Sequence, residues 1–325
     1  MPLLYFDNNI ISYLHHPERY AAENWHSGLS VIKDYLNNPG NAAKVLYSPA
    51  HLMDVRRGFA KDKEQALAKL KFLSELTRDS CIVKDIFSND VQFEQRDATV
   101  FFSKNSDNPE DFLAPGEHGI NLLAIVEDSH LFDKHKDKRL NYSAVAEAFA
   151  PLEMNLQRTK ENPTVYSMMC DFAEYYQDLF TSGHKIYKIV RDKARAETGV
   201  AEKIAGQENP LALLEQLFQE TDLGRRINDV MIESFRLDPK NREDIVASLF
   251  MNLDLLGFEK DKLSERHGYM SVATDASHCF YASYCDIFVT QDSKTAAKSR
   301  AVYKYLKIDT EVFDVKQLEK WINLS

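Results

Sequence analysis

The sequence predicts an α/β protein whose parallel sheet is formed by both ends of the chain and is interrupted by a large α-helical insertion. Short apolar runs alternate with amphipathic helical patterns over residues 1–88, and the same alternation returns over residues 271–325. Long helical patterns with few β-branched runs fill residues 89–270. Because such alternation is typical of parallel β-α units, we expect a discontinuous sheet domain over 1–88 and 271–325 and a helical subdomain over 89–270.

The N-terminal stretch is predicted to contain three strands separated by helices. The run LLYF at 3–6 predicts the first strand, and a helical pattern follows it directly. A second helical pattern spans 21–36 and ends before Pro39 and Gly40, which break helices. The run KVLYSP at 44–49 predicts the second strand. The remaining elements of this stretch are helices at 50–60 and 62–76 and a third strand at 81–87.

The insertion and the C-terminal stretch differ in pattern. In the insertion, Pro151 splits the first of four long helical patterns, and Pro210 begins the third at its first position. These patterns cover residues 142–160, 165–197, 210–221 and 241–258.

In the C-terminal stretch, a helix is predicted to begin near Asp275. It is followed by a strand at 287–290, a helix at 294–306, a strand at 310–315 and a helix at 316–324.

The composition excludes several classes of protein. The chain has 325 residues, of which 44% are hydrophobic and 28% charged, as in a folded globular protein. No apolar run approaches the ~20 residues needed to cross a membrane, and the N-terminus lacks the features of a secretory signal. The four cysteines form no C-x-x-C pair, so neither a zinc site nor a disulfide framework is indicated. We therefore expect a cytoplasmic protein with no membrane partner.

The net charge of −10 is unevenly distributed along the chain. Residues 1–80 carry 10 basic and 9 acidic side chains, and residues 271–325 carry 7 of each. The acidity therefore belongs to the middle of the chain. Because attraction of a ligand depends on the local potential, the end segments can still present a basic face to nucleic acid.

Four acidic residues are predicted to meet at one edge of the sheet. Asp7 closes the first strand, Asp292 follows the strand at 287–290, Asp275 opens the helix that leads to that strand, and Asp54 lies on the helix after the second strand. The carboxyl ends of parallel strands meet at one edge, where sites form. Carboxylates packed together repel one another. A divalent cation removes that conflict, and Mg²⁺ or Mn²⁺ prefers such oxygen ligands.

Three segments carry a resemblance to a known family. YFDNNIISYL resembles the opening of the PIN domain family, in which a strand ends in Asp and an Asn follows two residues later. DASHCFYASYCDIFVTQD resembles the closing motif of that family, and YSPAHLMDV resembles its intermediate motif, where the family usually has Glu. The resemblance covers residues 1–85 and 271–325, less than half of the chain.

The resemblance implies a fold, an activity and a set of site residues. It implies a PIN-like sheet and a Mg²⁺- or Mn²⁺-dependent endoribonuclease that cuts single-stranded or structured RNA with a water activated by one or two ions. Asp7, Asp275 and Asp292 would bind metal, and Asp54 would take the place of the usual Glu with a side chain one methylene shorter. The supporting residues would be Asn9, which orients the Asp7 region, and Thr290, which adds hydrogen bonds.

Each candidate also has a structural interpretation. Asp7 and Asp275 are suited to capping a helix, which contributes about 1 kcal/mol, and Asp292 is suited to a turn. His278 shares a helix face with Asp275 and is interpreted as a hydrogen-bonded structural residue or as a general acid or phosphate contact. His51, three residues before Asp54, has the same interpretations. Asp286 lies about 15–20 Å from Asp292 along the strand and is excluded.

Basic residues follow two of the acids. Arg56 and Arg57 follow Asp54, and Lys294, Lys298 and Arg300 follow Asp292. They are predicted either to contact phosphates beside the acidic cleft or to lie on the surface as solubilising charges.

Two further functions compete with a ribonuclease. In the first, the PIN-like half is a catalytically silent scaffold, and the helical insertion binds a protein or nucleic-acid partner. In the second, the chain is another α/β phosphohydrolase. The haloacid dehalogenase family needs a second Asp two residues after the first, where this chain has Asn9, so this hypothesis ranks last. The sequence does not predict an oligomeric state.

Overall fold

A computed structural model describes most of the chain. The described residues are 2–38, 40, 43–59, 62–84, 91–104, 137–150, 154–181, 187–189, 191–192, 195–196, 199–219, 242–263 and 269–324. Pro151 and the last residues of the third predicted strand, 85–87, lie outside them.

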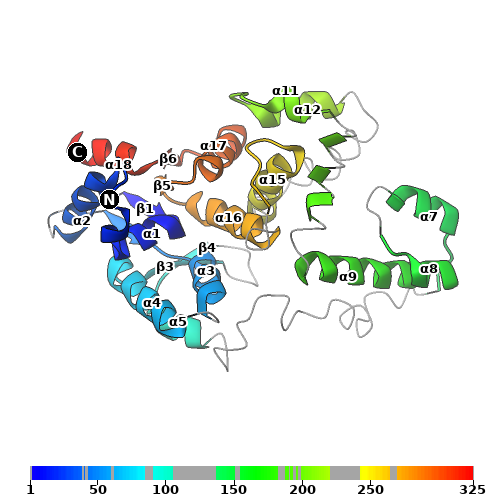
Figure 1. The fold of residues 1–325 in the computed structure, drawn as a ribbon, viewed down its shortest axis with the longest axis horizontal. Coiled ribbons are helices and arrows are strands. Elements are labelled where there is room, and N and C mark those ends of the chain that lie inside the picture. Colours follow the sequence, from blue (N-terminus) through cyan, green and yellow to red (C-terminus); the bar gives the residue numbers. More distant parts are fainter. Residues whose placement is uncertain are drawn as a thin grey trace. The chain divides into compact units, whose positions relative to one another are not determined.

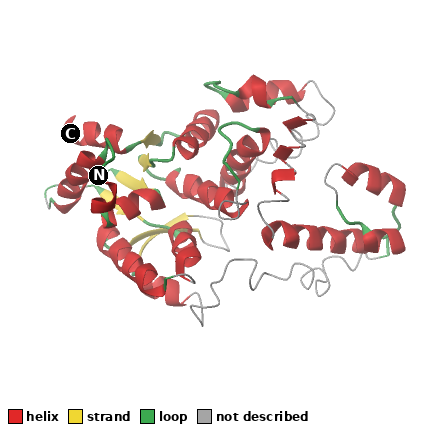
Figure 2. Cartoon of the chain, viewed as in Figure 1, coloured by secondary structure: helices red, strands yellow, loops and turns green. Residues whose placement is uncertain are grey.

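The protein is mixed α/β and contains a four-stranded parallel sheet flanked by helices, as the sequence predicts (Figure 2). The strand order is β2-β1-β5-β6, and each pair is parallel. The strands come from both ends of the chain: β1 (Leu3–Phe6), β2 (Lys44–Leu46), β5 (Ile287–Val289) and β6 (Glu311–Phe313). In the register of the central pair, Leu4 lies opposite Ile287 and Phe6 opposite Val289.

A second, antiparallel sheet lies beside the first. It pairs β3 (Ser80–Lys84) with β4 (Val91–Gln95). A single parallel bridge between Tyr47 and Cys81 links β3 to the chain just after β2. The sequence analysis assigned no strand to 91–95. Most β4 side chains are exposed, so the strand lacks the apolar run that identifies a buried strand.

Helices cover the strands, as Figure 1 shows for the blue and red ends of the chain. The N-terminal helices are α1 (Asn8–His15), the 3₁₀ helix at Pro17–Tyr20, α2 (His26–Asn37), α3 (Pro49–Phe59), α4 (Lys63–Thr77) and α5 (Ala98–Lys104). The later helices are α11 (Ala201–Ile204), α12 (Pro210–Gln219), α15 (Arg242–Leu256), α16 (Tyr269–Ala282), α17 (Ser293–Leu306) and α18 (Val315–Leu324).

The two faces of the sheet have different coverings. Side chains alternate along a strand, so Leu4 and Phe6 point to one face and Tyr5 to the other. The first face belongs to a buried core that also contains residues of α1, α2, α4 and α18. In this core α2 and α18 lie side by side, and a Cβ on Gly28 would come within 2.9 Å of Val315 Cγ1. The absence of that Cβ permits this close approach.

The chain divides into two compact units. One contains residues 1–112, 200–261 and 272–325, and the other contains 113–199 and 262–271. Residues 200–261, which the sequence assigns to the insertion, therefore belong to the unit that holds the sheet.

The second unit contains α7 (Tyr142–Phe149), α8 (Gln157–Glu161) and α9 (Val165–Thr181). Its buried Asp171 on α9 accepts hydrogen bonds from the backbone amides of Arg158 and Thr159, which lie at the start of α8. Across both units, the described helices include none with the length and apolar character that a bilayer crossing requires.

Candidate active site at the carboxyl end of the sheet

The strand order places a topological switch point between β1 and β5. The chain leaves β1 toward β2 on one side, whereas β5 and β6 lie on the other side. Ligands of open α/β sheets bind outside the carboxyl ends of the strands at such a point. Asp7 follows β1 and Thr290 follows β5, and the Asp7 amide donates to the Val289 carbonyl at 2.8 Å. Both residues therefore lie where a site is expected.

Asp7 is a buried carboxylate held from the end of β5. Only 5% of its surface is exposed. Its Oδ2 accepts hydrogen bonds from Thr290 Oγ1 at 2.7 Å and from Asn9 Nδ2 at 3.4 Å, so both supporting residues contact it as the resemblance implies. Asp7 precedes α1, but its side chain makes no capping hydrogen bond. Burial raises the pKa of Asp7, and the charge of Asp54 raises it further, while His278 and Thr290 lower it.

Asp54 on α3 is paired on both oxygens. Its Oδ2 accepts from His278 Nε2 at 2.9 Å, and its Oδ1 accepts from Arg57 Nη2 at 2.9 Å. Burial alone would raise the pKa of this carboxyl. The hydrogen bond and charge of His278, together with Arg57 and Lys69, outweigh burial, so the pKa lies below its usual value. Asp54 therefore holds its negative charge more easily than Asp7 does.

A buried hydrogen-bonded chain supports His278 from the second face of the sheet. The Tyr5 hydroxyl lies 2.8 Å from His278 Nδ1 and 2.6 Å from Ser48 Oγ. His51 Nε2 donates to the Phe6 carbonyl at 2.7 Å, and its Nδ1 accepts from the Ser48 amide at 3.0 Å. Burial is the main cause that lowers the pKa of His51 to about 3, so this imidazole is neutral. His51 thus has the structural role that was one of its two interpretations.

Asp275 does not open a helix, which corrects the prediction. Its helix, α16, begins at Tyr269, six residues earlier. The residues just before Asp275 continue the helix and include no proline or glycine after Gly268. The carboxylate is half-buried and accepts no hydrogen bond from the described residues. Burial raises the pKa of Asp275 well above its usual value, Asp7 and Asp54 raise it further, and Lys298 lowers it.

Asp292 has a capping role. It precedes α17, and its Oδ1 accepts from the backbone amides of Lys294 at 2.8 Å and Thr295 at 3.1 Å. Its own amide donates to Thr290 Oγ1 at 3.2 Å, and that hydroxyl also holds Asp7. Asp292 and Asp7 therefore both contact Thr290, and Asp292 Oδ1 is occupied by the backbone amides of α17.

The charges of three of the four predicted acids affect one another. Asp275 is affected by the charges of both Asp7 and Asp54, and Asp7 is affected by Asp54. Asp292 and Asp7 share the contact with Thr290 and an influence on the pKa of Tyr13. The pKa of Tyr13 is raised to about 12, mainly by burial and then by Tyr20, with smaller contributions from these two acids.

The predicted basic residues lie in several environments. Arg57 pairs with Asp54, and Lys294 Nζ lies 2.9 Å from the Lys260 carbonyl and 3.5 Å from Asp261. Arg300 Nη2 donates to the Val312 carbonyl at 2.7 Å. Arg56 is half-buried, and burial lowers its pKa.

Lys298 is neither a phosphate contact nor a surface charge, the two roles predicted for it. Its side chain is fully buried, 3.2 Å from Asp254 and 2.8 Å from Asp261. Burial alone would lower its pKa, but Asp254 and Asp261 outweigh that effect and raise it. Lys298 therefore neutralises interior acids and has no surface position from which to contact a phosphate.

Sequence reasoning missed two contributors to the site. The Tyr5 hydroxyl is hydrogen-bonded to His278. In the sequence, Tyr5 is simply one of the four residues of the apolar run LLYF and gives no sign of this role. Lys69 lies on α4, within electrostatic reach of Asp54 and Asp7. In the sequence it is a charged residue of an amphipathic helix, which gives no signal of this position.

The acids suit a divalent cation by their chemistry. Asp7 and Asp275 have raised pKa values mainly because they are buried and further because of neighbouring negative charges. A cation there would favour their ionised forms. Hard cations such as Mg²⁺ and Mn²⁺ take oxygen ligands. As the side chains stand, no set of three His, Cys, Asp or Glu residues within the described ranges is arranged around one ion position.

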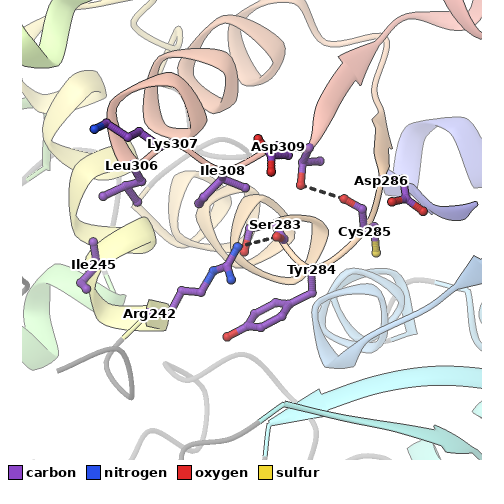
Figure 3. A pocket seen from close by; sticks show the side chains of 11 residues that line it. Arg242, Ile245, Ser283, Tyr284, Cys285, Asp286, Leu306, Lys307, Ile308 and Asp309 are labelled. Carbon is purple, nitrogen blue, oxygen red and sulfur yellow. Dashed lines mark hydrogen bonds between the residues drawn. The ribbon is translucent and has the colours of Figure 1, made fainter.

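A cavity lies at the opposite edge of the sheet from the acids, where β5 and β6 begin. It has a volume of about 600 Å³ (Figure 3). Arg242 Nη2 donates to the Ser283 carbonyl at 2.5 Å, and its guanidinium lies over the Tyr284 ring at 4.2 Å. Asp286, which the sequence analysis excluded from the site, accepts a hydrogen bond from the Leu3 amide at 2.6 Å.

Comparison with known proteins identifies no relative: no family model, curated protein or solved structure matches the chain.

Proposed function

We propose that the protein is a divalent-metal-dependent ribonuclease whose site is the acid cluster at the carboxyl end of the sheet. The observation that carries the proposal is geometric: Asp7 ends β1 at the switch point, and Asp54 is hydrogen-bonded to His278, three residues from Asp275 on α16. The charges of these three acids also affect one another. Asp275 in particular is half-buried without a hydrogen-bond donor among the described residues. Buried carboxylates without donors destabilise the fold when no metal is bound. A role in binding a cation would explain why the protein has them.

The residues of the cluster have distinct roles under this proposal. Asp7 and Asp275 would hold the cation, Asp54 would complete the negative site, and Asp292 would contribute from the start of α17. A bound Mg²⁺ or Mn²⁺ supplies charge stabilisation at a phosphate oxygen and lowers the pKa of a water. Thr290 fixes the orientation of Asp7 through the 2.7 Å hydrogen bond. His278 keeps Asp54 ionised and in place.

RNA is the proposed substrate for two reasons. The three segments that resemble the PIN domain family contain Asp7, Asp54, Asp275 and Asp292, and that resemblance implies cleavage of RNA. The end segments of the chain, which build the sheet and most of the site, carry as many basic as acidic residues, so a polyanion can approach them despite the net charge of −10.

Cleavage of RNA in the presence and absence of metal tests the proposal. Purified protein is incubated with total RNA and either Mn²⁺ or EDTA, and new RNA ends are mapped. We expect new ends with Mn²⁺ and none with EDTA. Asp7→Asn removes a charge at the cluster with little change in shape and should abolish cleavage while the circular dichroism spectrum is retained.

A matched control is Asp309→Asn. Asp309 is an exposed aspartate at the opposite edge of the sheet, before β6, and its replacement should leave cleavage unchanged. If Asp7→Asn cuts as fast as the parent protein, the proposed mechanism is excluded.

The second candidate is a catalytically silent scaffold whose helical insertion binds a protein or nucleic-acid partner. One observation favours it: both oxygens of Asp54 are already engaged, by His278 and Arg57. A scaffold of this kind shows no divalent-dependent turnover of RNA or DNA, so the same incubation separates the two candidates.

A further inference from the structure

We infer that the cavity between α1 and α4, beside Asp54, is a subsite for a phosphate of the RNA backbone, with Lys69 as its central cation. The inference rests on the proposed function and adds to it the location of a neighbouring phosphodiester. The cavity has a volume of about 260 Å³. That volume exceeds the ~30 Å³ that one water occupies in the liquid several-fold, so the cavity can accommodate a phosphate group.

Lys69 presents a cation to this cavity without an anionic partner. Its Nζ donates to Ser12 Oγ at 2.8 Å, and the Ser12 hydroxyl in turn donates to the Asn8 carbonyl at 2.9 Å. Within the described part of the chain, no carboxylate lies at ion-pair distance from Lys69. An ammonium has three N–H donors, and a neutral hydroxyl accepts only one of them here.

Further basic side chains line the same cavity. Arg19 contributes an exposed guanidinium, and His15 and His16 contribute imidazole rings. His15 stacks on Phe72 with a centroid separation of 4.7 Å, which fixes its ring. Burial lowers the pKa of His15, and the charges of His16, Lys69 and Arg19 lower it further. Lys69 and Arg19 thus place two cationic side chains beside the cavity, where they would attract a phosphate.

The two acidic residues that line the cavity are already engaged. Asp54 is paired with His278 and Arg57, as described above. Asp62 caps α4, and its Oδ1 accepts from the Gln65 amide at 2.9 Å. They therefore leave Lys69 available to an incoming anion. Lysine binds phosphate as a point charge, and phosphate contacts position nucleic acid without reading its sequence.

The position of the cavity relates it to the acid cluster. Asp54 belongs to both, and Lys69 is near enough for Asp54 and Asp7 to raise its pKa against the larger lowering effect of burial. A cation bound by the acids and a phosphate bound by Lys69 would therefore be neighbours. We infer that an RNA strand whose scissile phosphate lies at the acids places an adjacent phosphate in this cavity.

Binding of RNA without metal tests the subsite separately from cleavage. A fluorescently labelled single-stranded RNA is titrated with protein in EDTA at several KCl concentrations, and binding is followed by anisotropy. Lys69→Met is compared with Lys71→Met. Lys71 lies two residues further along α4, its side chain is 79% exposed, and it pairs with Glu75 at 4.0 Å, so it controls for loss of one charge from the same helix.

We expect Lys69→Met to weaken RNA binding about tenfold, as loss of one hydrogen bond between charged groups does. The slope of log affinity against log salt concentration should become shallower by about 0.7, as expected for one lost phosphate contact to a single strand. Lys71→Met should change neither quantity measurably. Lys69→Arg keeps the charge and should retain most of the affinity. It is the second test if the methionine variant does not fold.

The possible outcomes distinguish this subsite from the proposed function. If Lys69→Met and Lys71→Met bind equally well while the parent cuts RNA with Mn²⁺, the subsite is excluded and the ribonuclease proposal stands. If the parent binds no RNA in EDTA at any salt concentration, the subsite is excluded. If the parent also cuts no RNA with Mn²⁺, both proposals fail.

Discussion

At the scale of single residues, the pKa values of Asp7, Asp54 and Asp275 differ because these acids have different hydrogen-bond donors. Asp54 has two charged or polar donors, and its pKa lies below the usual value. Asp7 has hydroxyl and amide donors, which do not offset its burial, and Asp275 has no donor among the described residues. Burial and like charge therefore raise the pKa values of Asp7 and Asp275. Without a cation, these two carboxylates destabilise the fold at neutral pH.

This difference predicts how stability depends on pH in EDTA. An aspartate has a pKa of about 3.9 when unfolded, and the pKa of Asp275 is higher in the fold. Between these two pKa values the folded state retains a proton that the unfolded state has lost. The contribution of Asp275 to the free energy of unfolding therefore falls as pH rises through that window. Asp275→Asn does not titrate and should lack this fall.

Urea denaturation from about pH 4.5 to about pH 7.5, above the unfolded pKa, measures the effect. The stability of Asp275→Asn relative to the parent should increase with pH. The difference between the two proteins reports Asp275 together with its interaction with Asp7 and Asp54. Asp54 itself gives no trend in this range, because its pKa lies below the usual value in the fold. Parallel stability curves would show that Asp275 is not destabilised by its neighbours.

At the scale of elements, the site depends on two strand-to-helix connections. β1 passes directly into α1 at Asp7, and β5 passes into α17 through Thr290 and Asp292. The parallel register of β1 and β5 places these two connections beside each other, and the Thr290 hydroxyl contacts both acids. Asp292 therefore has a structural role at the start of α17 in addition to the proposed role at the metal.

Two substitutions of Asp292 separate these roles. Asn is as good an N-cap as Asp, whereas Ala removes the cap and costs about 1 kcal/mol. We expect Asp292→Ala to lower the free energy of unfolding by about that amount and Asp292→Asn to lower it much less. Both remove the carboxylate, so both should lose Mn²⁺-dependent cleavage. Urea denaturation and the RNA assay measure the two effects. Full cleavage by Asp292→Asn would restrict Asp292 to its capping role.

At the scale of the whole molecule, the sheet could be predicted because its strands leave local signals. LLYF and IFVT are short apolar runs that end at polar residues, and parallel strands buried on both faces have this pattern. From this reasoning Asp7 and Asp292 were predicted to lie at one edge, and the structure links them through the Thr290 hydroxyl. β4 was missed because its side chains are largely exposed.

Other features depend on contacts between distant segments and leave no local signal. Lys298 has the appearance of a surface lysine on an amphipathic helix, but Asp254 and Asp261 on and after α15 hold it in the interior. The start of α16 was placed too late because Asp275 has the character of a capping residue, whereas the helix already begins at Tyr269. Lys69 becomes a candidate ligand-binding residue only because α4 packs against α1.

The central claim is that Asp7, Asp54 and Asp275 form one site for a divalent cation, and a Mn²⁺ titration followed by thermal unfolding tests it most directly. A ligand that binds only the folded state stabilises it by RT ln(1 + [L]/Kd), so the melting temperature rises with ligand concentration. We predict that Mn²⁺ raises the melting temperature of the parent and of Asp309→Asn, but not that of Asp275→Asn or Asp7→Asn. Equal shifts in the parent and both cluster variants, or no shift in any of these proteins, would contradict the account.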